Sequence, residues 1–360
     1  MLRYAYVHVI YWKVVKSDRC CGSRLSQYNV GILKVKQILI EFIKTTFIFP
    51  VRNSFIHLNR FFGSYSDVIW LVGDGRSGTT WVSSIINSQS KARELFEPYH
   101  FEVLGTNQFA PYKYSTPATL SSELETIYDR IFSGKLLHRR ADFGNLNIFY
   151  KGMVVKDIFI SPSVFAIVSK YPNVKPVLLI RNPFAVVLSK HNKENAYWPT
   201  DLSVYINEPN LMKRLGPQIE LYLANAQERQ NFIEIQFIHW AMGNRILLQD
   251  FCQKTLHIIF YEDMKTEPSS ELVKLKKFLG KRFSFVPTYV NNKTYSRPSR
   301  VVTNSQRVEH EYSIDYWKGL FKKEDFELGL EVLTLFEMDK LYTADGMPNR
   351  HEFRRFGFTV

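Results

Sequence analysis

The sequence predicts an α/β fold of the three-layer, P-loop-like kind, with a central parallel sheet and helices on both faces. Two observations lead to this prediction. Short apolar runs of strand length alternate with helical patterns along the chain, which is typical of a parallel sheet covered on both sides. The first run, residues 68–72, is followed at once by a glycine-rich turn and a helical pattern, the strand–turn–helix order of a phosphate-binding loop.

The remaining elements follow in order. The apolar runs predict further strands, and the apolar periodicity with its glycine and proline stops predicts helices. We expect strands at 153–155, 177–180 and 256–260, and helices at 82–90, 120–132 (ending at Gly134), 161–171, 184–191, 217–250 and 269–279 (ending at Gly280). Residues 192–216, rich in aromatic residues and containing proline, are expected to form a loop or lid.

The composition of the chain limits the classes of molecule that it is expected to bind. The 360-residue chain is 45% hydrophobic and 22% charged, as expected of a folded protein. Its net charge of +13 is spread without a long lysine tract, so we expect polyanionic small molecules or an anionic membrane surface as partners rather than nucleic acid. Cys20, Cys21 and Cys252 have no disulfide or metal-ligand spacing, so we expect a reducing, cytoplasmic location and no metal.

We divide the chain into a basic, mostly helical N-terminal extension (1–66), a catalytic domain (67–345) and a C-terminal tail (346–360). No apolar stretch of the extension is long and free enough of charges to span a membrane. Residues 32–49 have an amphipathic helical pattern with basic residues on the polar side. Such a helix packs on the protein core, the commoner case, or docks at the inner face of a membrane.

The turn at 73–81 (GDGRSGTTW) has the glycine spacing of a nucleotide-binding loop but carries Thr79 where that loop has lysine. That lysine serves the β- and γ-phosphates of a nucleoside triphosphate. We therefore expect the turn to hold a phosphate, but not that of ATP or GTP.

A second anion site is predicted where the strand at 177–180 ends. Arg181 follows this strand, at a place where an NTPase would carry a magnesium-binding acid, and Ser189 lies eight residues further on. A guanidinium binds phosphate through two hydrogen bonds, and a hydroxyl adds a donor. The alternative is that Arg181 pairs with a carboxylate and Ser189 lies on a helix surface.

These motifs resemble those of PAPS-dependent sulfotransferases. Residues 76–80 (RSGTT) look like their 5′-phosphosulfate loop, residues 181–189 (RNPFAVVLS) like their 3′-phosphate motif, and residues 261–280 like a third family segment. The RSGTT form is nearest to the carbohydrate or bacterial and tyrosylprotein enzymes. Gly75 stands where many members have proline, which we expect to loosen the turn. The resemblance implies 3′-phosphoadenosine 5′-phosphosulfate (PAPS) as donor and 3′-phosphoadenosine 5′-phosphate (PAP) as product.

The resemblance also assigns site residues. For donor binding it points to Arg76, Ser77, Gly78, Thr79, Thr80, Trp81, Arg181, Ser189, Tyr261, Arg297, Ser299 and Arg300. In-line sulfuryl transfer depends mainly on positioning and electrostatics, and Arg76 with the loop N–H groups would stabilise the leaving phosphate. We expect Glu97 to be the general base, with its pKa raised by Phe96 and Pro98; Glu94 and His100 are its rivals. Lys156 would stabilise the sulfuryl oxygens, or else pair with Asp157.

We therefore predict a sulfotransferase acting on a hydroxyl or amine, with a glycan, glycolipid or lipid-linked sugar as the expected acceptor. Residues 99–150 and 192–235 should line its site. There, aromatic side chains either stack on sugar rings or belong to the core: Tyr197, Trp198, Tyr205 and Tyr222. Two alternatives are a kinase or NTPase, opposed by Thr79 and Arg181, and a non-catalytic PAPS- or nucleotide-binding protein, opposed by Arg76, Glu97 and Lys156.

Overall fold

A computed structural model describes residues 44–192, 198–289 and 314–358. Its contacts divide the chain into two units, Met1–Asn53 and Ser54–Val360, and the second contains the sheet. Of the amphipathic pattern at 32–49, residues 32–43 lie outside the described part, and a π-helical turn, η1 (Lys44–Ile48), leads into α3 (Phe49–Phe61). None of the helices in the described ranges is long and apolar enough to cross a membrane.

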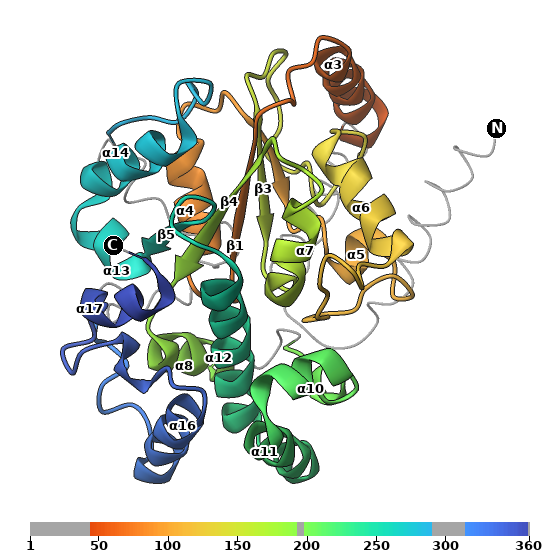
Figure 1. The fold of residues 1–360 in the computed structure, drawn as a ribbon. Helices are drawn as coiled ribbons and strands as arrows, with labels where there is room; N and C mark the ends of the chain where they lie inside the picture. The colour runs from red at the N-terminus through yellow and green to blue at the C-terminus, as the bar shows by residue number, and fades with distance from the viewer. Residues whose placement is uncertain (1–43, 193–197, 290–313, 359–360) are drawn as a thin grey trace, which may run out of the picture. The chain divides into compact units, whose positions relative to one another are not determined.

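The centre of the second unit is a five-stranded, all-parallel sheet with strand order β2-β3-β1-β4-β5 (Figure 1). The strands are β1 (Val68–Gly73), β2 (Arg93–Phe96), β3 (Met153–Asp157), β4 (Val174–Ile180) and β5 (His257–Phe260). The predicted fold, a central parallel sheet with helices on both faces, is confirmed.

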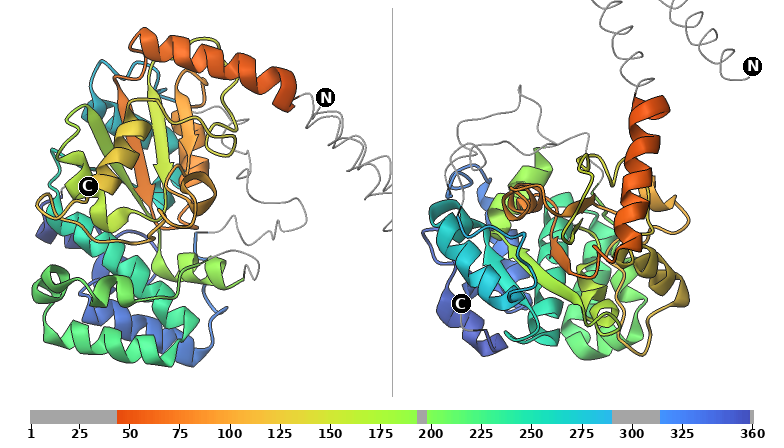
Figure 2. Two further views of the ribbon diagram at one scale, coloured as in Figure 1. Left: turned by 90° about the vertical axis from the view of Figure 1, so that its right-hand side faces the viewer. Right: turned by 90° about the horizontal axis from the view of Figure 1, so that it is seen from above.

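Side chains alternate across the sheet and feed two separate apolar layers. Val68, Trp70 and Val72 of β1 face the larger cluster, which includes residues of α6 (Ser122–Phe132), α7 (Val164–Val168), α8 (Pro183–His191) and α12 (Phe232–Asp250). Ile69 and Leu71 face the smaller cluster with residues of α4 (Thr79–Ile86) and α14 (Pro268–Leu279). Figure 1 shows α4 and α14 on one side of the strands, α6 and α7 on the other, and α8 and α12 below them; Figure 2 gives two further views of this arrangement. The buried strands are apolar on both faces because both faces are covered.

Several of the described helices begin at a side-chain cap. Ser121 caps α6, Asn182 caps α8 and Asn231 caps α12, each accepting hydrogen bonds from N–H groups of the first turn. The bounds are α4 (Thr79–Ile86), α5 (Phe101–Leu104), α6 (Ser122–Phe132), η2 (Ser161–Ser163), α7 (Val164–Val168), α8 (Pro183–His191), α9 (Ser203–Ile206), α10 (Pro209–Leu215), α11 (Pro217–Arg229), α12 (Phe232–Asp250), α13 (Tyr261–Thr266), α14 (Pro268–Leu279), α16 (Lys323–Leu335), η5 (Asp339–Leu341), α17 (Arg350–Phe353) and η6 (Arg354–Phe356).

Several segments differ from the expectation. The helix expected at 161–171 is the 3-10 turn η2 followed by α7, which ends at Val168. Residues 198–216, expected as loop or lid, contain α9 and α10, because Pro209 begins a helical turn and Gly216 ends it. The helical stretch 217–250 is two helices, since Gln230 adopts a left-handed conformation (φ 53°) and Asn231 starts α12. In the segment named above as the C-terminal tail, Phe353 and Phe358 are buried in the larger apolar cluster.

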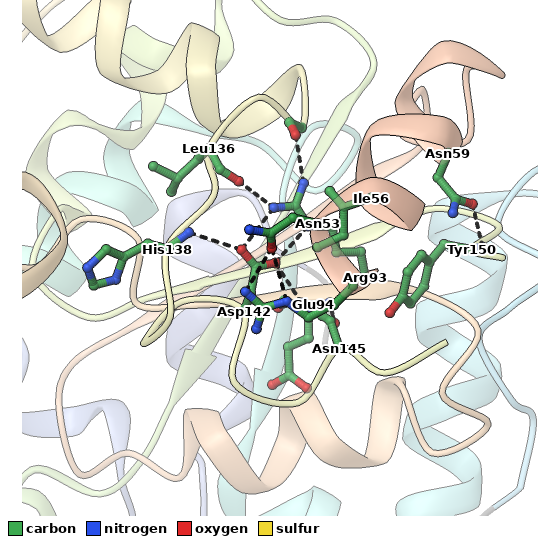
Figure 3. A network of polar contacts seen from close by, with 12 residues as sticks. Asn53, Ile56, Asn59, Arg93, Glu94, Leu136, His138, Asp142, Asn145 and Tyr150 are labelled. Carbon is green, nitrogen blue, oxygen red and sulfur yellow. Dashed lines mark hydrogen bonds and ion pairs between the residues drawn. The ribbon is translucent and has the colours of Figure 1, made fainter. Parts of the chain in front are cut away.

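β2 is an edge strand of the sheet, and the segment 140–145 covers its outer edge. Phe96 N–H donates to the Ala141 carbonyl, and the Asn145 amide both accepts from Glu94 N–H and donates to its carbonyl. A fully buried ion pair holds this segment: Arg93 Nε lies 2.9 Å from Asp142 Oδ1, while its other nitrogens donate to the Gly134 and Leu136 carbonyls (Figure 3). The pairing satisfies a strand edge that would otherwise be free to pair with another chain.

Candidate active site

The glycine-rich loop joins β1 to α4 through two left-handed residues. Arg76 has φ 71° and Gly78, which precedes the first residue of α4, has φ 92°. The turn is closed by Ser77 N–H donating to the Asp74 carbonyl at 3.2 Å. The first N–H groups of a helix lack partners within it, and they point at the space before it. The loop therefore has the form of an anion site at a helix N-terminus.

Tyr261 of α13 packs directly on this loop. A Cβ at Gly78 would lie 2.6 Å from the Tyr261 ring, so only glycine fits there. The same ring lies 5.5 Å from the Trp81 ring, centroid to centroid, and 4.1 Å from the Arg181 guanidinium carbon. The structure thus brings Trp81, Arg181 and Tyr261, each predicted to bind the donor, to one place beside Gly78.

The two predicted phosphate sites are in contact. Arg76 Nε donates to Ser189 Oγ at 3.0 Å, and Arg181 Nη1 donates to the Arg76 carbonyl at 3.0 Å. Behind them, Glu262 accepts from Asn182 N–H at 2.9 Å, which fixes the start of α8. The three motifs that are distant in the sequence therefore form one constellation at the carboxyl ends of β1, β4 and β5, where open α/β sheets bind ligands.

Glu97 and Lys156 lie at the carboxyl ends of the neighbouring strands β2 and β3. Lys156 Nζ lies 2.5 Å from Glu97 Oε1 and 3.3 Å from the hydroxyl of Thr80, which connects this pair to the loop. Arg140 binds the other oxygen of Glu97. Both Glu97 and Lys156 are buried. A carboxylate, an ammonium and the phosphate-type loop thus meet at one edge of the sheet.

The expected rise in the Glu97 pKa is wrong. Burial raises the pKa, but Lys156 and Arg140 outweigh it and lower the pKa of Glu97 to about 2. Phe96 does lie beside the site, yet its ring contacts the Lys156 ammonium, 4.1 Å from the centroid. The residue is therefore ionised at neutral pH, held by two cations.

Glu94 and His100, the alternative candidates for the general base, lie in other environments. Glu94 points under α4, where its Oε1 accepts from Ser83 Oγ at 2.8 Å. His100 caps α5, and burial together with Arg140 lowers its pKa to about 4. The alternative pairing of Lys156 with Asp157 is not found: Asp157 accepts from Trp70 Nε1 at 2.9 Å and from Tyr128 OH at 3.2 Å.

Three charged residues of the site were missed from the sequence. Arg140 belongs to the segment that covers β2, which has no helix or strand pattern. Asp74 and Lys190 form a buried ion pair, with Lys190 Nζ 2.8 and 2.7 Å from the two Asp74 oxygens. They link the first residues of the loop to α8, next to Ser189. The available signal was their position, since Asp74 lies within the loop motif 73–81 and Lys190 directly follows the motif 181–189.

Two polar atoms near the loop are buried without a hydrogen-bond partner among the described residues: the hydroxyl of Ser77 and the indole Nε1 of Trp198. Trp198 covers Gly75 so closely that a Cβ there would lie 2.3 Å from its ring. A buried unpaired donor is costly, and a ligand can satisfy it. The Ser77 hydroxyl, the loop N–H groups and the arginines thus form a donor set that fits a phosphate. The described residues include no group of side chains that could hold a metal ion.

The other residues predicted for the site lie in or against the protein core or outside the described residues. Thr79 is buried in the first turn of α4, and Tyr205 is buried in the core, where its hydroxyl lies 3.0 Å from His239 Nδ1. Tyr222 is partly buried and packs against the core. Tyr197 and the predicted donor-binding residues Arg297, Ser299 and Arg300 lie outside the described residues.

Comparison with known proteins identifies the family. The model of the sulfotransferase domain matches residues 66–323, which is most of the chain. None of the curated protein sequences matches significantly. Among solved structures, a sulfotransferase from Alicyclobacillus acidocaldarius is 16% identical and covers 63% of this chain and 87% of its own, with a TM-score of 0.33.

Two further structures are similar at the same level. Mouse sulfotransferase SULT7A1, complexed with PAP, is 16% identical, covers 81% of this chain and 88% of its own, and has a TM-score of 0.37. The sulfotransferase domain of the Synechococcus olefin synthase is 17% identical, with coverages of 75% and 93% and a TM-score of 0.35. The family match rests on the sequence of residues 66–323, and it confirms the prediction of a PAPS-dependent enzyme: the chain belongs to the sulfotransferase family.

Proposed function

We propose that the chain transfers a sulfuryl group from PAPS to a hydroxyl group of an acceptor, with Glu97 as general base. The observation that carries the proposal is the joining of the three motifs: Arg76 contacts Ser189, Arg181 contacts the Arg76 carbonyl, and the Tyr261 ring packs against Arg181. A donor with phosphates at both the 5′ and 3′ positions fits the loop on one side and Arg181 with Ser189 on the other. The loop has no lysine for a γ-phosphate.

The side chains divide the work of transfer. The acceptor oxygen attacks sulfur in line while the bond from sulfur to the leaving phosphate oxygen breaks. Arg76 and the N–H groups at the start of α4 stabilise the charge on that phosphate. Lys156 faces the equatorial sulfuryl oxygens, and Glu97 takes the proton of the acceptor hydroxyl. The Thr80 hydroxyl accepts a hydrogen bond from Lys156 Nζ at 3.3 Å and so connects Lys156 to the phosphate-binding loop.

For the acceptor we propose a glycan or lipid-linked sugar, as in the carbohydrate or bacterial branch that the RSGTT form resembles. Trp198 supports this: its ring lies over Gly75 of the loop, and its indole N–H has no hydrogen-bond partner within the part of the chain that the structure describes. An aromatic face with one free donor suits a sugar ring. We also keep a cytoplasmic location, with residues 32–49 at the inner membrane face, as a proposal; cell fractionation of the full chain tests it.

Calorimetry tests the donor. PAP should bind at least tenfold more tightly than ATP with magnesium, and tighter binding of ATP would overturn the proposal. Arg181→Met should weaken PAP binding by about 10- to 150-fold, because a charge-assisted hydrogen bond contributes about 1.5–3 kcal/mol. Arg229→Met is the matched control: Arg229 pairs with Glu234 on the adjoining helix pair α11–α12, and its loss should leave PAP binding unchanged.

A further inference from the structure

The segment 143–149 presents a row of apolar side chains to solvent. Phe143, Leu146, Ile148 and Phe149 are all exposed, Leu146 to 72% and Phe149 to 71%. The end of α3 adds Leu58, Phe61 and Phe62, which are also exposed. These seven side chains, here called the apolar loop face, are nearly half of the fifteen large exposed apolar side chains among the described residues. A concentration of this kind marks an interaction surface.

Polar contacts join the pieces of this face. Asn59 Nδ2 donates to the Ile148 carbonyl, and Asn59 Oδ1 accepts from Tyr150 N–H at 2.8 Å. Asn147 Nδ2 donates to the Ser90 carbonyl, and Lys151 N–H donates to the Lys91 carbonyl at 2.7 Å. The end of α3, residues 90–91 and the segment 143–151 therefore lie side by side.

The buried network of Figure 3 holds the loop in this exposed position. Asp142, next to Phe143, is paired with Arg93, and Asn145 is bonded to both the backbone of Glu94 and the carboxylate of Asp142. All three side chains are buried while their neighbours Phe143 and Leu146 point outward. The apolar residues are thus presented by a fixed frame.

The charges around the face are basic. Arg60, Lys91, Lys135 and Lys151 are exposed. Within 54–66, 87–91 and 133–151 the sole acid is Asp142, which is buried against Arg93. The nearest acids in the adjoining sequence are also engaged: Asp67 pairs with Arg282, and Glu94 is buried against Ser83. No acidic side chain of these segments faces solvent beside the apolar residues.

We propose that the apolar loop face docks on an anionic lipid surface. Apolar side chains that enter the interface, ringed by lysine and arginine, are the combination that such a surface binds. The sequence that precedes α3 points to the same partner, since residues 1–43 carry seven Lys or Arg against two acids, among many apolar residues. The docking is independent of the reaction, because the loop face lies toward the amino end of β2 and Glu97 follows its carboxyl end.

Vesicle sedimentation with the full chain tests the proposal. The protein should bind vesicles of phosphatidylcholine containing phosphatidylserine and should bind vesicles of phosphatidylcholine alone at least tenfold more weakly. Substituting Phe143, Leu146, Ile148 and Phe149 together by serine should weaken binding to the anionic vesicles at least tenfold. Lys91→Glu with Lys151→Glu should also weaken it at least tenfold and reduce its salt dependence.

A matched variant controls for general apolarity. Leu221→Ser with Val273→Ser removes two other exposed apolar side chains, from α11 and α14, and should leave vesicle binding unchanged. All variants should keep the unfolding temperature and PAP affinity of the parent. Vesicle binding that survives the serine substitutions would overturn the proposal. So would a parent dimer that the same substitutions dissociate while vesicles bind neither form, because the face would then belong to a second copy.

Discussion

The ammonium of Lys156 lies 2.5 Å from a carboxylate oxygen of Glu97, so the cation and the base proposed for sulfuryl transfer are paired with each other. Their pairing lowers the Glu97 pKa and keeps the carboxylate ionised. A sulfuryl group placed at the end of β3 offers Lys156 a second anion. We propose that Lys156 turns toward that anion, which would raise the pKa of Glu97 and make it a stronger base as the acceptor loses its proton.

Replacing Glu97 by glutamine tests the base. Glu97→Gln keeps the shape of the side chain but cannot take a proton, so turnover should fall by about 10²–10⁴-fold. PAP affinity should stay within a factor of about three, because Glu97 lies away from the Arg181–Ser189 site. The measurements are steady-state sulfuryl transfer and calorimetry with PAP. Undiminished turnover would remove Glu97 from the mechanism.

The pH–rate profiles should show different Glu97 pKa values for the free enzyme and for its complex with donor and acceptor. The profile of kcat/KM reports the free enzyme and that of kcat the complex. With the Glu97 pKa lowered to about 2, the acid limb of kcat/KM should lie below about pH 4. The limb of kcat should lie at higher pH, because Lys156 is then engaged by the sulfuryl group. Arg140→Met should raise the kcat/KM limb as well, and coincident limbs in the parent enzyme would contradict this account.

The sequence was sufficient to locate the glycine-rich loop, the Arg181–Ser189 pair and the strands that position them, because each is a local pattern. Arg76, Arg181 and Tyr261 each lie within a motif whose glycine, proline or aromatic spacing is visible in the chain. Their meeting at one sheet edge follows from the parallel order of the strands.

The electrostatics of Glu97 could not be predicted in the same way. Arg140 reaches Glu97 across 43 residues, through a segment whose path is set by covering the edge of β2. Phe96 and Pro98 suggested desolvation alone, and the sign of the pKa shift depends on cations that the local sequence does not place. The contact of Trp198 with Gly75 is likewise a tertiary contact between residues distant in the sequence. From the sequence, Gly75 was expected only to loosen the turn, whereas in the structure it makes room for the Trp198 ring.

Gly75→Ala should be destabilising because of Trp198. The new Cβ would lie 2.3 Å from the ring, and overpacking of this kind costs about 1–3 kcal/mol. In a double-mutant cycle with Trp198→Ala, the cost of the Gly75 substitution should largely disappear. Denaturant unfolding measures all four proteins. Strictly additive effects would show that any cost of the Gly75 substitution does not come from the Trp198 ring.

Lys190→Met should destabilise the protein strongly. The variant leaves the buried Asp74 carboxylate without its cation, and breaking a buried pair from one side costs about 3–5 kcal/mol. Adding Asp74→Asn should recover much of the loss, since no buried charge then remains. Lys318→Met, which removes an exposed pair with Asp315, should cost about 0–1 kcal/mol and serves as the control. Equal losses in the two lysine variants would contradict the assignment.

Glu262 should make the free energy of unfolding depend on pH between 4.5 and about 7. Burial raises the Glu262 pKa from 4.5 to about 7, against the hydrogen bond from Asn182 and the charge of Arg181. Because the folded state holds this proton more tightly than the unfolded state, its contribution is full below about pH 4.5 and is lost as the pH rises through about 7. The loss is on the order of 3 kcal/mol. Glu262→Gln, which can still accept from Asn182 N–H, should flatten the decline of unfolding free energy between pH 4.5 and 7. A parent protein whose stability curve matches that of Glu262→Gln over this range would show that the carboxyl group titrates normally.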